Sequence, residues 1–171
     1  MIFETERLLV RQFVFEMDQE NFYLLNGDEE VMRYIRLAKT REECAVFLQE
    51  IIARGEKTPS IGRWAAIEKG TGNFVGSFAI IPIEETEFLQ LGYALLKEFW
   101  GRGFASELTK AGLRYYFSTT NAAEIYAITE EANTASQKVL LKNGFIPDGI
   151  REEGERRLLQ FLVKRKGPGH T

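Results

Sequence analysis

The stretch from Leu91 to Phe117 constrains the fold most strongly, because a strand pattern passes into a helical pattern through two closely spaced glycines. The apolar run Phe88 to Leu96 is typical of a strand, and the residues from Ala105 onward place apolar or small side chains three and four positions apart, as in a helix. Gly101 and Gly103 therefore lie at a strand-to-helix junction. The first turn of a helix leaves N–H groups unpaired at the positive end of its dipole. Glycines let an anion such as phosphate approach this backbone closely.

The glycine pair alone does not distinguish a phosphate site from a tight turn that needs positive φ. Two known phosphate motifs do not fit this stretch. No Lys-Ser/Thr follows a second glycine, as a P-loop requires, and the third glycine of the dinucleotide fingerprint is missing. The surrounding chain has to decide between the two interpretations.

Composition and charge exclude several classes of protein. A chain of 171 residues predicts one domain with a sizeable core. The net charge of −3, without a basic block, does not indicate a nucleic-acid surface. A charged amino end and the lack of a long apolar run indicate neither a signal peptide nor a membrane partner, so we expect a cytoplasmic protein. With Cys44 and His170 as the only residues of their types, we expect no disulfide, no metal site and no histidine base.

The order of predicted elements favours an α/β (α+β) fold in a single domain, 1–171, with a core from 5 to 163 and a loose tail from 164 to 171. We expect a mixed, largely antiparallel sheet with helices on both faces. Pro82 should end a strand, and Gly76 indicates a bulge or close packing. Strands are predicted at Thr5–Phe13, Trp64–Ile67, Phe74–Ile81, Phe88–Leu96, Glu124–Thr129, Phe145–Ile150 and Leu158–Val163. Helices are predicted at Met17–Leu25 and Asp28–Ile35, after a capping box at Thr40, from Ala105, and over Asn133–Asn143.

A second motif spans Asn133 to Phe145. Asn133 is a suitable N-cap and Gly144 a suitable helix stop, so the motif is also consistent with a simple capped helix. Its place directly after a strand, downstream of the glycine-rich junction, is a more specific arrangement. Cys44, on the helical face after Thr40, is interpreted as a small buried residue and not as a reactive thiol.

The two motifs together, WGRGFASE followed by N-x-x-S-x-x-V-L-x-K-x-G-F, resemble the GNAT superfamily of acetyl-CoA-dependent N-acetyltransferases. The opening TERLLVR and the LGYAL before the glycines are similar to its RimJ/RimL-like branch, the ribosomal-protein N-terminal acetyltransferases and their relatives. The likeness extends from Thr5 to about Val163. It implies a GNAT-like acyl-CoA N-acyltransferase fold, with two central parallel strands splayed around the cofactor.

The resemblance also implies a binding site for acetyl-CoA, with coenzyme A as co-product. The N–H groups of the glycine loop would hold the pyrophosphate, and the strands Gly92–Leu96 and Glu124–Thr129 would flank the pantetheine arm. Lys97, Arg102, Lys138 and Lys142 either neutralise phosphates or are solvated surface charges. The implied cofactor-binding residues are Tyr93, Ala94, Leu95, Trp100, Gly101, Arg102, Gly103, Phe104, Ala105, Ser106, Asn133 and Ser136.

The implied chemistry is direct attack of a neutral amine on the thioester carbonyl. Ser136 is the implied acid for the departing thiolate, and N–H groups beside a bulged strand would polarise the carbonyl. The chain departs from many relatives at two positions: Gln90 replaces a carboxylate base and Leu140 replaces a tyrosine acid. The base is therefore left open among Glu87, Glu130 and Tyr93 acting through water, or an α-amine of low pKa needs none.

The implied acceptor is a primary amine, either the N-terminus of a peptide or ribosomal protein or a small molecule. We expect Met17–Ile52 and the loop Pro82–Thr86 to set its identity. The acids of that loop suggest a cationic acceptor, or are only a solvated turn. Because of Gln90, the alternative is a sensor or regulatory domain that binds acetyl-CoA without efficient catalysis. The sequence does not specify an oligomeric state and leaves a homodimer open.

Overall fold

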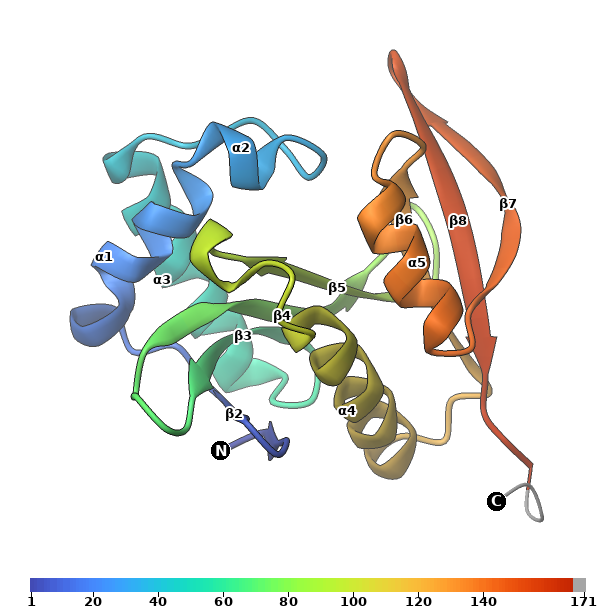
Figure 1. Cartoon of the computed structure of the whole chain (residues 1–171), viewed down its shortest axis with the longest axis horizontal. Helices are drawn as coiled ribbons and strands as arrows, with labels where there is room; N and C mark the ends of the chain where they lie inside the picture. The colour runs from blue at the N-terminus through green and yellow to red at the C-terminus, as the bar shows by residue number, and fades with distance from the viewer. Residues whose placement is uncertain (168–171) are drawn as a thin grey trace.

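In the computed structural model, which describes residues 1–167, one mixed sheet carries helices on both faces (Figure 1). The strand order is β1-β2-β3-β4-β5-β6-β8-β7. The strands are β1 (Phe3–Glu4), β2 (Leu8–Arg11), β3 (Gly62–Glu68), β4 (Phe74–Pro82), β5 (Leu89–Leu95), β6 (Glu124–Glu130), β7 (Ile146–Glu153) and β8 (Arg156–Lys164). The helices are α1 (Phe15–Asn26), α2 (Glu29–Met32), α3 (Arg41–Lys57), η1 (Lys97–Phe99, a 3₁₀ turn), α4 (Phe104–Thr119) and α5 (Thr134–Lys142).

Two of the predicted helix starts, at Thr40 and Asn133, are capped as the sequence indicates, and Asp28 adds a cap that was not predicted. Thr40 accepts a hydrogen bond from the Glu43 N–H, and the Glu43 side chain accepts one from the Thr40 N–H, which completes the capping box of α3. Asp28 accepts from two N–H groups at the start of α2. Asn133 caps α5 by accepting from the Ser136 N–H at 3.2 Å.

The strand alternation divides the core between the two faces of the sheet. Side chains from Trp64, Phe78 and Leu95 pack with α4 and α5 on one face. Ala65 and Ala94, each next to a residue of the first set, pack with α1, α2 and α3 on the other. Cys44 is buried in this second cluster, as predicted.

Several elements differ from their predicted bounds. The strand predicted at Thr5–Phe13 is shorter and begins at Leu8, because the Thr5 backbone N–H and side chain bond to Leu8 and form a turn after the unpredicted strand β1. The 3₁₀ turn η1 between β5 and the glycine loop was not predicted. Lys164, expected in a loose tail, ends β8. Arg165 after it donates hydrogen bonds to the carbonyl of Phe117 in the last turn of α4 and to the carbonyls of Thr120 and Ala122 in the α4–β6 connection. His170 lies outside the described residues.

The two central strands, β5 and β6, are parallel and share a single register pair, Gln90 with Tyr126. Every other neighbouring pair in the sheet is antiparallel. Figure 1 shows β6, β8 and β7 running across the direction of β4 and β5. The predicted splay between two parallel strands is therefore confirmed.

Two glycines allow close approach of neighbouring elements. A Cβ at Gly76 would lie 2.0 Å from the Ala94 carbonyl oxygen, and one at Gly112 would lie 2.1 Å from the Phe78 ring. The close packing predicted at Gly76 is confirmed, and the β3–β4 register also shifts beside it. Gly112 sets how closely α4 approaches the sheet. Pro82 is the last residue of β4, as predicted.

We expect Gly112→Val to lower the free energy of unfolding by about 2–3 kcal/mol, because the fully buried Phe78 ring has no space to move away. Urea unfolding monitored by circular dichroism measures the change. Gly70→Val is the control, since nothing lies within 4 Å of its Cβ position. Equal stability of the two variants would contradict the close packing of α4 on β4.

Candidate functional site

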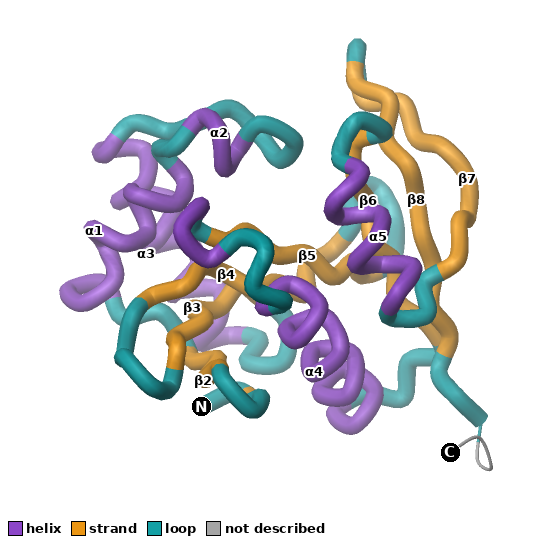
Figure 2. Tube along the Cα trace, viewed as in Figure 1, coloured by secondary structure: helices purple, strands orange, loops and turns teal. Residues whose placement is uncertain are grey.

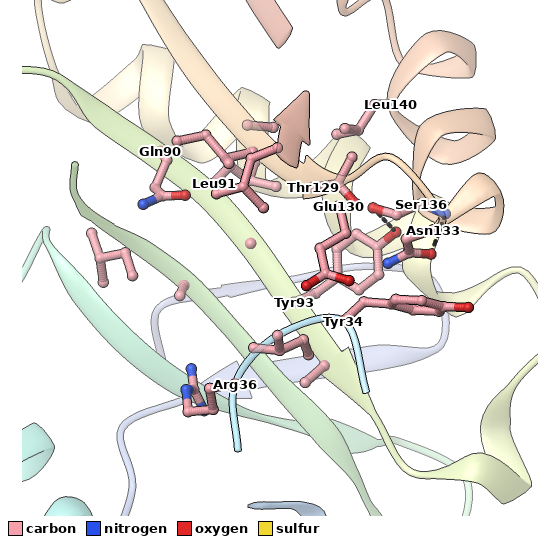
Figure 3. A pocket seen from close by; sticks show the side chains of 18 of the residues that line it. Tyr34, Arg36, Gln90, Leu91, Tyr93, Thr129, Glu130, Asn133, Ser136 and Leu140 are labelled. Atoms are coloured by element: carbon pink, nitrogen blue, oxygen red, sulfur yellow. Dashed lines mark hydrogen bonds between the residues drawn. The ribbon is translucent and has the colours of Figure 1, made fainter. Parts of the chain in front are cut away.

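A cavity of about 260 Å³ opens where β5 and β6 separate (Figure 3). Because side chains alternate along a strand, it has two sides. Leu91 and Tyr93 belong to the α4–α5 face, and Gln90 and Gly92 to the face of α1–α3. The lining residues are Tyr34, Ile35, Arg36, Arg63, Ala79, Ile81, Gln90, Leu91, Gly92, Tyr93, Ala94, Ala127, Ile128, Thr129, Glu130, Asn133, Ser136, Leu140, Glu153, Arg156 and Leu158.

The glycine loop follows β5 and leads into α4 (Figure 2). Gly101 and Gly103 have φ of 71° and 81°, the left-handed region that glycine adopts without strain. No side chain caps α4. The N–H groups of residues 101–106 find no acceptor among residues 1–167. Such a row of free donors at a helix N-terminus suits an anionic ligand, as the sequence predicts.

An ion-pair cluster from the start of the chain fixes the first turn of α4. The Glu107 carboxylate accepts hydrogen bonds from the Thr5 hydroxyl and from the Arg7 backbone N–H at 2.9 Å. The Arg7 guanidinium donates to it at 2.8 Å through Nε and lies 2.7 Å away through Nη2. Burial acts to raise the pKa of Glu107, but these hydrogen bonds outweigh it, so the pKa is lowered. Arg7 also stacks on the Phe104 ring, 4.2 Å from its centre.

The basic residues near the loop differ in how they are paired. Arg102 forms an ion pair with Glu68 at 2.9 Å, and Lys97 pairs with Glu30 at 2.9 Å. Lys138 and Lys142 are exposed on α5 and form no ion pair with residues 1–167. The Arg7 Nη2 atom lies 3.4 Å from where a Cβ on Gly103 would be, so Arg7 is a further positive charge beside the loop. No sequence pattern predicts this position of Arg7.

Three polar residues meet where the cavity reaches α5 (Figure 3). The Tyr93 hydroxyl donates to the Ser136 Oγ at 3.4 Å. Burial raises the pKa of Tyr93, although the hydrogen bond to Ser136 lowers it, so the phenol holds its proton at neutral pH. Asn133 lines the same side and uses its Oδ1 in the α5 cap. A neutral phenol beside a serine is suited to donating a proton into the cavity.

The predicted base positions are not all at the cavity. Glu130 lines it, and its carboxylate accepts a hydrogen bond from Arg156 Nε at 2.7 Å. Glu87 is exposed in the β4–β5 loop and is not among the lining residues. Gln90 and Leu140 line the cavity, so the two positions that depart from many relatives both face it.

The residues present fit the expected coenzyme. Thr129 Oγ1 is buried in the cavity wall and has no hydrogen-bond partner among residues 1–167, so it can take a polar ligand. Beyond the single register pair, the backbone N–H and C=O groups on the facing edges of β5 and β6 are not paired with each other. An extended ligand between the strands could form hydrogen bonds with these groups. The expected bulge is not seen against β4, where the register of β5 is continuous from Leu89 to Leu95.

Three lining residues of the α1–α3 face were not predicted individually: Tyr34, Arg36 and Arg63. Tyr34 and Arg36 belong to the stretch Met17–Ile52 that we expect to set the identity of the acceptor, and Arg63 lies outside it. Tyr34 and Arg36 follow α2, and Arg63 lies in β3. Their contribution depends on how α2 and β3 pack beside β5. A single sequence contains no local pattern that reports this packing.

The family model and the similar sequences place this chain in one family, and the similar solved structures share its fold. Residues 7–146 match the family model described as Acetyltransferase (GNAT) domain. The chain is 30% identical over 173 residues, 99% of it and 93% of the relative, to the uncharacterized N-acetyltransferase YoaA of Bacillus subtilis. A GNAT-family acetyltransferase from Bacillus anthracis superposes with a TM-score of 0.82 at 24% identity, over 94% of this chain and 96% of that one. RimL, a ribosomal α-N-protein acetyltransferase in complex with coenzyme A, superposes with a TM-score of 0.81 at 16% identity, over 95% and 97%.

We expect Glu107→Gln to lower the free energy of unfolding by about 1 kcal/mol at pH 7, because charge-assisted hydrogen bonds to Thr5 and Arg7 are weakened. The folded-state pKa of Glu107 lies below its ordinary value of 4.5, so its contribution is present above that pH. The contribution is lost as the pH falls through the lowered folded-state pKa.

Urea unfolding of both proteins at pH 7 and pH 3 measures this difference, which should shrink at the lower pH. The control is Glu98→Gln, an exposed carboxylate without an ion pair in the described chain. A difference of the same size at both pH values would contradict the role of the ionised carboxylate.

Proposed function

Because this chain belongs to the GNAT acetyltransferase family, we propose that it transfers the acetyl group of acetyl-CoA to a primary amine by direct attack on the thioester. The observation that carries the proposal is the continuity of two features. The N–H groups of residues 101–106, which have no acceptor among residues 1–167, follow β5 after the 3₁₀ turn η1, and β5 also lines the cavity beside β6. None of the helices in residues 1–167 is long and apolar enough to span a membrane.

The residues that would hold the coenzyme come from the loop and the separated strands. The N–H groups of 101–106 are suited to the pyrophosphate, with Arg7 beside Gly103 as an additional positive charge. Thr129 Oγ1 and the free edges of β5 and β6 are suited to the amide groups of the pantetheine arm. When bound, acetyl-CoA supplies an activated acetyl thioester.

The chain's own proton donors lie on the α5 side of the cavity. Tyr93 donates to Ser136 Oγ, so the Ser136 hydroxyl proton remains available for a leaving group. Tyr93 keeps its own proton, since its pKa is raised by burial, and it can replace the one that Ser136 gives up. We therefore assign Ser136 as the acid, and Tyr93 as its support and not as the base.

The base has to act on the other side, where the acceptor enters. An amine of pKa about 8–10 is mostly protonated at pH 7, so a proton acceptor near the cavity increases the reactive fraction. Of the two carboxylates predicted as bases, Glu87 and Glu130, Glu130 lines the cavity, and a hydrogen bond from Arg156 holds it in place. An α-amine of low pKa is already partly neutral at pH 7, so it would depend least on Glu130 as a base. N-terminal peptides and small amines both remain candidate acceptors.

A second function, coenzyme sensing without turnover, follows from Gln90, because an amide in the cavity cannot accept the amine proton. Calorimetric titration with acetyl-CoA, followed by a thiol-release assay on amines and N-terminal peptides, separates the two. Binding with thiol release establishes the transferase. Binding without release on a broad panel favours the sensor, and no binding would contradict the coenzyme site.

We expect Gly103→Val to raise the Kd for acetyl-CoA by about 100-fold, because a side chain would occupy the approach of the phosphates and the left-handed backbone would be strained. Calorimetric titration measures Kd. Gly149→Val is the matched control, since it places the same residue at a positive φ in β7, away from the loop. Unchanged affinity in Gly103→Val would remove the loop from the binding site.

Ser136→Ala should lower kcat by about 100-fold and leave the Kd for acetyl-CoA unchanged, because the variant removes a proton donor but keeps the Asn133 cap of α5. Stopped assays of thiol release measure kcat. Ser118→Ala, at an exposed position of α4, is the control. Normal turnover in Ser136→Ala would assign the proton transfer to another group.

A further inference from the structure

Two arginines in the wall of the cavity lack an acidic partner. Arg36 and Arg63 both line it, and neither forms an ion pair with a carboxylate among residues 1–167. Both are partly buried. A charged side chain that is withdrawn from solvent is normally paired, so two unpaired cations at one site need an explanation.

We propose that the amine acceptor of this protein carries a carboxylate, and that Arg36 and Arg63 hold it on the α1–α3 side of the cavity. The inference rests on the proposed acetyl transfer, and it names the class of substrate: a small amino acid-like molecule. It assigns specificity to two residues of the α2–α3 loop and β3.

The sheet register places Arg63 on the acceptor side. Arg63 in β3 pairs with Ala79 in β4, which pairs with Gly92 in β5, so the three share one face. That face is opposite to Tyr93, which contacts the proposed proton donor Ser136. Ala79 and Gly92 are small, and nothing lies within 4 Å of the Cβ position of Gly92. Space is therefore left in front of Arg63, across two strands, up to the gap between β5 and β6.

Both guanidinium groups lie beside the ring of Phe47 in α3. The Arg36 and Arg63 guanidinium carbons are 5.4 and 5.8 Å from the centre of the Phe47 ring. Arg36 is oriented by donating to the Asn26 side-chain oxygen at 2.9 Å. Burial, and then the charge of Arg36, lowers the pKa of Arg63 to about 9. Burial also lowers the pKa of Arg36. Burial is the largest cause of both shifts, and no carboxylate among residues 1–167 offsets it.

The other charged groups around the cavity do not compensate the pair. Glu130 already accepts a hydrogen bond from Arg156. Glu153 is exposed and lies opposite Arg156 in the β7–β8 register. Lys39 adds a third cation beside Phe47, at 5.3 Å from the ring centre. The acids Glu84 and Glu85, which suggested a cationic acceptor, are exposed in the β4–β5 loop and do not line the cavity.

The charge pattern orients the acceptor. Guanidinium groups bind carboxylates through paired hydrogen bonds, so the acidic end of the acceptor would be held at β3 and α2. Its amine would then extend toward the gap between β5 and β6, where Glu130, the proposed base, lines the cavity. A polyamine would place positive charge against two unpaired arginines, which disfavours it.

The inference is tested by measuring initial rates of thiol release from acetyl-CoA. The acceptors are the common amino acids, the carboxamide of each amino acid, and spermidine. At least one amino acid should exceed its carboxamide about tenfold or more in kcat/KM, and spermidine should be poorer than that amino acid. Arg63→Gln should raise the KM for the amino acid about tenfold or more while leaving the KM for the carboxamide unchanged. Arg54→Gln, an exposed arginine of α3 with the same charge change, is the matched control.

Equal or better use of carboxamides or spermidine would overturn the inference. Where no acceptor turns over, calorimetric titration of the protein loaded with coenzyme A decides instead. Binding of an amino acid but not of its carboxamide, lost in Arg63→Gln, supports the anion site, and the lack of any carboxylate binding overturns it. Failure of acetyl-CoA to bind would overturn the proposed function, and titration of the coenzyme-free protein with the same amino acids still tests the arginine pair.

Discussion

The separation of two parallel strands is the constraint on which the rest of this structure depends. β5 and β6 meet at one register pair, while β4 holds β5 and β8 holds β6 along their lengths. Because each strand has its own outer partner, the gap can stay open without loss of the sheet. Unpaired backbone groups inside a protein are costly unless a ligand or water satisfies them. A gap of this kind is therefore suited to an extended polar ligand, and the orphan hydroxyl of Thr129 in its wall is consistent with that use.

The glycine loop continues the same strand and provides the second part of the site. Two left-handed glycines turn the chain after η1, so that, among residues 1–167, the first N–H groups of α4 have neither a backbone acceptor nor a side-chain cap. The amino-terminal residues Thr5 and Arg7 fix this turn through Glu107, across about a hundred positions of sequence. The turn between β1 and β2 thus has a role beyond joining two strands, because it holds the start of α4 and places a positive charge beside the loop.

Strand alternation then separates the chemical tasks. On one face, Tyr93 and Ser136 form a neutral pair suited to proton donation. On the other face, Arg36 and Arg63 line the cavity without an ion pair among residues 1–167, and Glu130, held by Arg156, lines it as well. A bound thioester and an incoming amine would meet where the two faces communicate. The sheet therefore keeps proton donors and acceptor recognition apart and joins them only at the gap.

The sequence by itself determined the strand-to-helix glycine junction, the caps of α3 and α5, the mixed sheet and the family. These features depend on neighbours within a few residues or on motifs with fixed spacing, so one chain contains the information. Only the tertiary structure decided which distant residues meet. Arg7 lies beside Gly103, Glu87 lies outside the cavity, and Arg36 and Arg63 line it from the α2–α3 loop and from β3. Such meetings depend on sheet order and helix packing, and neither leaves a periodic or local pattern in a single sequence.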